Sequence, residues 1–145
     1  MKKNILLIAA IFLLLVSIAY WYSVSSHNNI QTRHISCADI TQPCQFQDLF
    51  AVRFLETPQP MKPLHLEVQM QHSVKAIHAD FAMQGMEMGL NRYRLLAASN
   101  PNTWQATITL PVCVQGRSDW EMLLEVESED GVQRFMVPFS AAMAR

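Results

Sequence analysis

Sulfur-bearing side chains are the residues of this chain best suited to chemistry. The stretch MQGMEMG places thioethers at Met83, Met86 and Met88, with a glycine inside the run and Gly89 after it. Soft thioether and thiolate donors select Cu(I), and glycines let the backbone bend so that several donors converge. The sequence therefore predicts a Cu(I) site with Met86 and Met88 as ligands and with Met83 or Cys113 completing it. The alternative is that these methionines only fill gaps at the end of a core.

The three cysteines cannot all pair within one chain. Cys37 and Cys44 are seven residues apart and flank a proline, so a local disulfide is the simplest pairing. A Cys44–Cys113 bridge is the alternative, and the sequence leaves the choice open. With the local pairing, Cys113 is left over, either as an inert buried thiol or as a metal ligand.

Sequence signatures of catalysis are missing. The chain has no G-x-S-x-G elbow, phosphate-binding loop, dinucleotide fingerprint or HExxH motif, and none of its 5 histidines forms a His-x-x-x-His pair. We therefore expect a binding protein and not an enzyme.

The amino terminus predicts a membrane anchor. Lys2 and Lys3 precede an uncharged run over residues 5–22, and about 18–20 apolar residues suffice to cross a bilayer core. The lysines favour a cytoplasmic amino terminus. Residues 1–22 are thus expected to be a single-pass anchor in the inner membrane, with the rest of the chain in the periplasm. The alternative is a signal peptide cleaved after Ser17-Ile18-Ala19.

Length and charge limit the remaining organisation. The chain has 145 residues and a net charge of −1, from 11 basic and 12 acidic residues. Such a balance gives no electrostatic reason to bind nucleic acid. Residues 23–36 are polar and aperiodic and are expected to be a spacer, and residues 37–145 are long enough for one periplasmic domain.

The exported part has the pattern of an all-β protein. In Leu64–Met70 apolar and polar residues alternate, as in a strand with one buried face. About seven such runs predict an immunoglobulin-like β-sandwich. The strand methionines Met70, Met122 and Met136 are expected in its core. The expected strands are Ala51–Leu55, Leu64–Met70, Val74–Met83, Asn91–Ala97, Trp104–Leu110, Trp120–Glu127 and Gln133–Phe139.

Successive antiparallel strands would bring the candidate ligands together. If the strands run up and down, the connections after the first, third and fifth strands emerge at one end. Those connections carry Met61, then Met86 and Met88, then Cys113. We expect these four side chains to share that end, with the anchor entering from the opposite one.

The region from about residue 75 to residue 139 resembles the FixH-like and YtkA-like exported domains. The matching stretches are AIHADFAMQGMEMGLNRYRL, WQATITLPVCVQGRSDWEMLLEV and QRFMVPF. The resemblance implies a membrane helix followed by an immunoglobulin-like sandwich, copper handling, and a respiratory oxidase assembly as a partner. The alternative function is that of a metal-free interaction or assembly module of an inner-membrane complex.

Overall fold

The structure is a computed structural model that describes residues 11–21, 31–86, 88–112 and 118–141. The chain divides into two compact units, Met1–Gln31 and Thr32–Arg145.

The first unit contains a helix over residues 11–21, all of whose side chains are exposed. Among the described residues, no helix has both the length and the apolar character needed to cross a membrane. Residues 5–10 and 22 of the apolar run lie outside the described residues, so the anchor over residues 5–22 stays a prediction.

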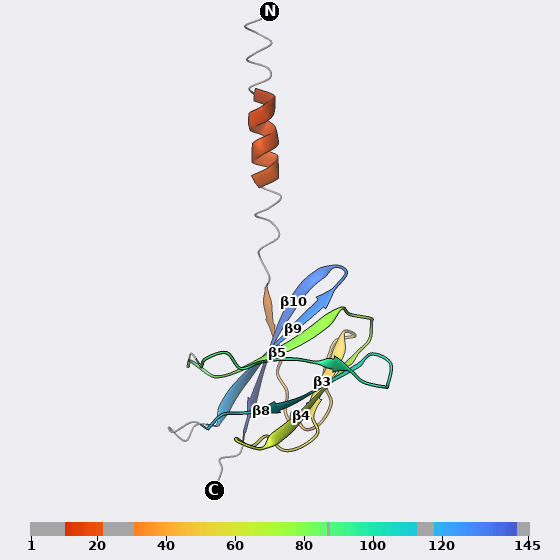
Figure 1. The fold of residues 1–145 in the computed structure, drawn as a ribbon, viewed down its shortest axis with the longest axis vertical. Coiled ribbons are helices and arrows are strands. Elements are labelled where there is room, and N and C mark those ends of the chain that lie inside the picture. Colours follow the sequence, from red (N-terminus) through yellow and green to blue (C-terminus); the bar gives the residue numbers. More distant parts are fainter. Residues whose placement is uncertain (1–10, 22–30, 87, 113–117, 142–145) are drawn as a thin grey trace, which may run out of the picture. The chain divides into compact units, whose positions relative to one another are not determined.

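The second unit is a sandwich of two five-stranded sheets (Figure 1). The first sheet has the strand order β1-β10-β9-β5-β6, and the second has the order β2-β3-β4-β8-β7. Neighbouring strands are antiparallel except for β1, which runs parallel to β10. The strands are β1 (Thr32–His34), β2 (Cys44–Phe46), β3 (Phe50–Phe54), β4 (Pro63–Met70), β5 (Ala76–Met83), β6 (Arg92–Arg94), β7 (Leu96–Ala97), β8 (Thr103–Thr109), β9 (Asp119–Ser128) and β10 (Gly131–Ser140).

The core lies between the two sheets. Along β4 every second residue is buried, as the alternation over Leu64–Met70 predicts. Aromatic rings then join the sheets: Phe50 of β3 lies 4.8 Å from Phe135 of β10, and Phe54 lies 5.1 Å from Phe139, measured between ring centroids. Both contacts are edge-to-face, the arrangement that aromatic pairs prefer. The all-β, two-sheet architecture is thereby confirmed.

The described residues form ten strands where about seven are expected. The polar segment 23–36 ends in β1, whose three residues are all exposed, so this strand has no apolar face that could mark it in the sequence. The expected strand Asn91–Ala97 is two strands, β6 and β7, in different sheets. Leu95, between them, is fully buried and donates its N–H to the carbonyl of Ile77 in β5. The chain thus crosses from one sheet to the other at Leu95.

Candidate functional site

Three connections meet at one end of the sandwich, which we call the methionine end. They are residues 55–62 after β3, residues 84–91 after β5, and residues 110–118 after β8, of which 87 and 113–117 lie outside the described residues. The N–H of Met61 donates to the carbonyl of Leu110 at 2.9 Å, which joins the first connection to the third.

The connection after β5 lies at the same end. The N–H of Gln84 donates to the carbonyl of Asp119 at 3.2 Å. Both residues line a cavity of about 400 Å³ together with Thr57, which follows β3. Because β1 runs parallel to β10, the chain enters the sandwich at Thr32 from the opposite end. The strand directions therefore bring the three connections together as the up-and-down topology predicts.

A tight turn follows β5 at the methionine end. The N–H of Met86 donates to the carbonyl of Met83 at 3.0 Å and closes a four-residue turn. Gly85 has a φ of 72°, a left-handed conformation that costs little only in glycine. The side chain of Met83 is 1% exposed and belongs to the core. Its sulfur is therefore enclosed by the sandwich.

The sulfur of Met88 takes the place of a strand partner. Strand β6 pairs with β5 only from His78 to Asp80, so within the part of the chain that the structure describes no strand pairs with this edge of β5 beyond Asp80. The N–H of Met83 on this edge donates to Sδ of Met88 at 3.3 Å. A thioether is a weak acceptor, and here it satisfies a backbone donor that would otherwise lack a partner.

The candidate ligands at the methionine end thus differ in how far their side chains are exposed. The side chains of Met86 and Met88 are half-buried and pack against the core, whereas Met61 is 65% exposed. Cys113 lies outside the described residues, so its place relative to the turn is not part of this geometry. Within the described residues, no group of three histidine, cysteine, aspartate or glutamate side chains could hold a metal ion.

Met136 differs from its expected core position. It is half-buried on the outer face of its sheet, because its neighbours Phe135 and Val137 point into the core. The prediction for Met70 and Met122 is confirmed, since both are buried.

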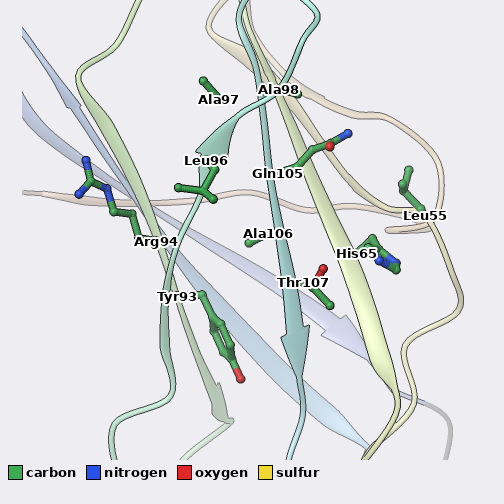
Figure 2. Close-up of a pocket in the computed structure, with 10 residues that line it drawn as sticks. All are labelled: Leu55, His65, Tyr93, Arg94, Leu96, Ala97, Ala98, Gln105, Ala106 and Thr107. Carbon is green, nitrogen blue, oxygen red and sulfur yellow. The ribbon is translucent and has the colours of Figure 1, made fainter.

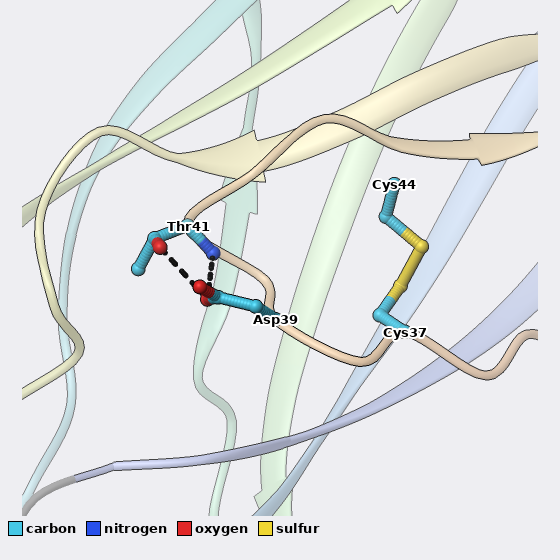
Figure 3. The surroundings of a disulfide bond; sticks show 4 residues. All are labelled: Cys37, Asp39, Thr41 and Cys44. Carbon is cyan, nitrogen blue, oxygen red and sulfur yellow. Dashed lines mark hydrogen bonds between the residues drawn. A yellow bond between two sulfur atoms is a disulfide. The ribbon is translucent and has the colours of Figure 1, made fainter.

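The local disulfide Cys37–Cys44 is present, with its Cα atoms 5.8 Å apart (Figure 3). In the loop that it closes, Oδ1 of Asp39 accepts hydrogen bonds from the hydroxyl and the N–H of Thr41, at 2.7 and 2.9 Å. The hydrogen bond from the Thr41 hydroxyl and, to a smaller extent, the one from its N–H lower the pKa of Asp39. This disulfide excludes a bridge between Cys44 and Cys113.

A groove crosses the outer side of the second sheet near β7 and β8 (Figure 2). Its volume is about 430 Å³, and Leu55 and Leu96, which are 47% and 69% exposed, stand at its sides. The ring of His65 in this groove lies 2.7 Å from the carboxylate of Glu56. Figure 2 shows the guanidinium of Arg94 directed away from the other labelled side chains of the groove.

Tyr93 closes the edge of β8 where β7 ends. Strand β7 pairs with β8 only at Leu96↔Gln105 and Ala97↔Trp104. Further along β8, the hydroxyl of Tyr93 donates to the carbonyl of Thr109 and accepts its N–H, both at 3.2 Å. One side chain therefore satisfies both backbone groups of a residue on an open strand edge.

Charged residues on the outer face of the first sheet join four strands. Arg92 contacts Asp80 and Glu125, each at 2.7 Å, and Arg134 contacts Glu125 at 2.9 Å. Partial burial opposes ionisation of Glu125, but the hydrogen bonds from the two arginines outweigh it and lower the pKa. This network connects Arg92 of the short strand β6 to Asp80 of β5 and to Glu125 of β9, and Glu125 in turn to Arg134 of β10.

Comparison with family models, with curated proteins and with solved structures finds no match to this chain. The sequence pattern indicates the methionine turn, but it gives no sign of the groove or of the role of Tyr93. The groove and the role of Tyr93 both depend on the crossing of the chain between sheets at Leu95. The sequence does not reveal this crossing, because the residues on either side of it have the pattern of one continuous strand.

Proposed function

We propose that the chain is a membrane-anchored periplasmic protein that binds Cu(I) at the methionine end and assists a respiratory or copper-handling complex. The observation that carries this proposal is the meeting of the three connections after β3, β5 and β8, because it gathers the sulfur-bearing segments at one end. Copper is the cargo of such a protein. The resemblance to FixH-like and YtkA-like domains supports the same function.

The strand orders support an immunoglobulin-like topology within this proposal. If the strands are counted from β3 and the short strand β6 is left out, the second sheet has the order first, second, fifth and fourth strand, with the short strand β2 at its edge. The first sheet places the last two strands beside the third. This agrees with the ABED and CFG sheets of immunoglobulin domains.

We further propose residues 5–22 as the anchor in the inner membrane. The run is uncharged and follows Lys2 and Lys3, as the positive-inside rule requires for export of the carboxyl-terminal part. The disulfide Cys37–Cys44 supports an oxidising compartment. Alkali extraction of membranes tests the anchor: the full chain should stay with the lipid, and a chain lacking residues 1–22 should not.

The geometry favours some of the candidate ligands over others. Met86 and Met88 present half-buried thioethers next to one turn, and soft sulfur donors suit Cu(I). Met83 would have to leave the core to bind an ion. Cys113, on the connection joined to Met61 through Leu110, is therefore the better third ligand.

A Cu(I) titration tests this ligand set. The full chain in detergent competes for Cu(I) with a chromophoric chelator under reducing conditions. Met86→Leu combined with Met88→Leu should abolish competition, and Cys113→Ser should weaken it. Met70→Leu is the matched control, because Met70 is a buried methionine beside Asn102 at the other end of the sandwich. Unchanged Cu(I) affinity in the double variant would exclude the proposed ligands.

The groove in Figure 2 favours a second function, a metal-free interaction or assembly module. Exposed leucines beside a concave surface, here Leu55 and Leu96, are typical of protein-binding sites. On this proposal, the Met86 and Met88 double variant should still co-purify with the membrane partner of the wild-type chain. Leu55→Ser with Leu96→Ser should lose that partner while retaining Cu(I) affinity.

A further inference from the structure

A second cavity opens between the sheets at the end opposite the methionine end. There the connections β2–β3, β4–β5 and β9–β10 turn, and the cavity between them has a volume of about 210 Å³. Its floor consists of core side chains, and its walls include half-buried Leu49 and Val74. The floor residues are Phe50, Met70, Val126 and Phe135.

Two of the floor residues, Phe50 and Phe135, belong to an aromatic cluster. The rings of Phe50 and Phe135 meet edge-to-face at 4.8 Å, and Phe46 packs against both, at 5.8 and 5.1 Å. Each ring is held by the other two, so the apolar surface is preformed. A preformed apolar surface binds an apolar group without the cost of ordering side chains.

Acidic residues surround the mouth of the cavity. Glu129 and Asp130, in the turn between β9 and β10, belong to its lining, and Asp48 lies in the turn between β2 and β3. The lysine on the neighbouring connection, Lys75, contacts the Glu129 carboxylate at 3.2 Å. These three connections therefore carry three acids, Lys75 and His72, and His72 also lines the cavity. Within the described residues, Asp130 has no ion-pair partner.

We propose that this cavity binds a small organic ammonium ion with an apolar body. The aromatic and aliphatic floor favours burial of the body. The acidic mouth favours a cation over an anion of equal shape. The volume is below the roughly 300–1,000 Å³ typical of sites for drug-sized ligands, which limits the body to about one ring or a short branched chain.

Two probes of similar shape and opposite charge test the proposal. They are 2-phenylethylamine and 3-phenylpropionate, added to the full chain in nanodiscs of zwitterionic lipid. Methionine-methyl NMR provides the readout. Met70 lines the cavity, whereas Met122 is buried in the core and is not one of the lining residues. The amine should shift the Met70 signal saturably, with an affinity about threefold to tenfold above that of the carboxylate. The Met122 signal should not move.

Two exposed acids allow the charge contribution to be removed without disturbing the core. Glu129→Gln with Asp130→Asn should reduce the affinity for the amine until the two probes bind alike. Glu121→Gln, a half-buried acid on the outer face of the first sheet, is the matched control and should change nothing. Equal Met70 shifts from both probes in the wild type, an unchanged preference in the double variant, or no Met70 response would each overturn the proposal. Cu(I) binding at the other end is independent of all three results.

Discussion

Breaking the disulfide Cys37–Cys44 should destabilise the sandwich by an amount that its loop length sets. The bridge joins residues separated by 7 positions. For a loop of that size, the chain-entropy relation gives a loss of about 2.4 kcal/mol in the free energy of unfolding at 25 °C. For the unit Thr32–Arg145, this corresponds to a fall of about 10 °C in Tm.

The structure shows why the loop matters to the fold. Ile40, inside the loop, is buried, and its carbonyl accepts the N–H of Phe54 at 2.8 Å. The bridge therefore holds a core residue and a hydrogen-bond acceptor against the end of β3. Without the bridge, both contacts must be made by a chain segment that has more conformations in the unfolded state.

The assay is urea unfolding of the full chain in detergent, followed by tryptophan fluorescence, with and without reductant. Reduction should lower the stability of the wild type and of Cys113→Ser equally. Cys37→Ser with Cys44→Ser should match the reduced wild type and should not respond to reductant. Insensitivity of the wild type to reductant would refute the reasoning, and so would a double variant that still loses stability on reduction.

Three further predictions concern the turn, the open edge and the charge network. Gly85→Ala should lower stability by about 1 kcal/mol because of its positive φ alone, whereas Gly89→Ala, which also has open space around it, should be neutral in the same urea assay. Tyr93→Phe should cost about 1 kcal/mol, since both backbone groups at the β8 edge lose their partner but can reach water; an unchanged midpoint would show that water replaces the hydroxyl fully. The pKa of Glu125 is lowered in the folded state, so its ionised form adds to the free energy of unfolding above about pH 4.3, and this gain is lost as the pH falls through the folded-state pKa. Glu125→Gln should therefore flatten the acid side of the plot of unfolding free energy against pH. A plot parallel to that of the wild type would contradict this role of Glu125.

The sequence predicts the parts of the fold that have one buried and one exposed face. Strand β4 alternates cleanly, and its burial follows the alternation residue by residue. Strand β1 has no buried face and pairs only through its backbone, so no pattern in the sequence marks it. The split of residues 91–97 between sheets is hidden for another reason: Leu95 is apolar and buried whether the segment stays in one sheet or changes sheets.

The candidate site is predictable to the same limited extent. Composition and spacing indicate that Met83, Met86 and Met88 share a turn, and strand direction indicates which other connections lie near it. Neither can indicate that Met83 faces the core while Met88 turns back to the edge of β5, because that depends on where β6 stops pairing. Within one turn, Met83 thus serves as a packing side chain and Met88 as a sulfur acceptor. What separates these two roles is the pairing of β5 with β6, which involves residues distant in the sequence.

This division affects how substitutions in the turn must be read. Leucine replaces the volume of methionine but offers no lone pair, so Met86→Leu removes a candidate metal ligand and little else. Met88→Leu also removes the acceptor of the Met83 N–H, which leaves an edge donor without its partner. A loss of Cu(I) affinity in Met88→Leu could therefore arise from a loosened turn, whereas the same loss in Met86→Leu could not. The single variant at Met86 is for this reason the stronger evidence for sulfur coordination. Unchanged affinity in the double variant excludes the ligands by itself, whereas a loss of affinity there indicates coordination only together with the same loss in Met86→Leu.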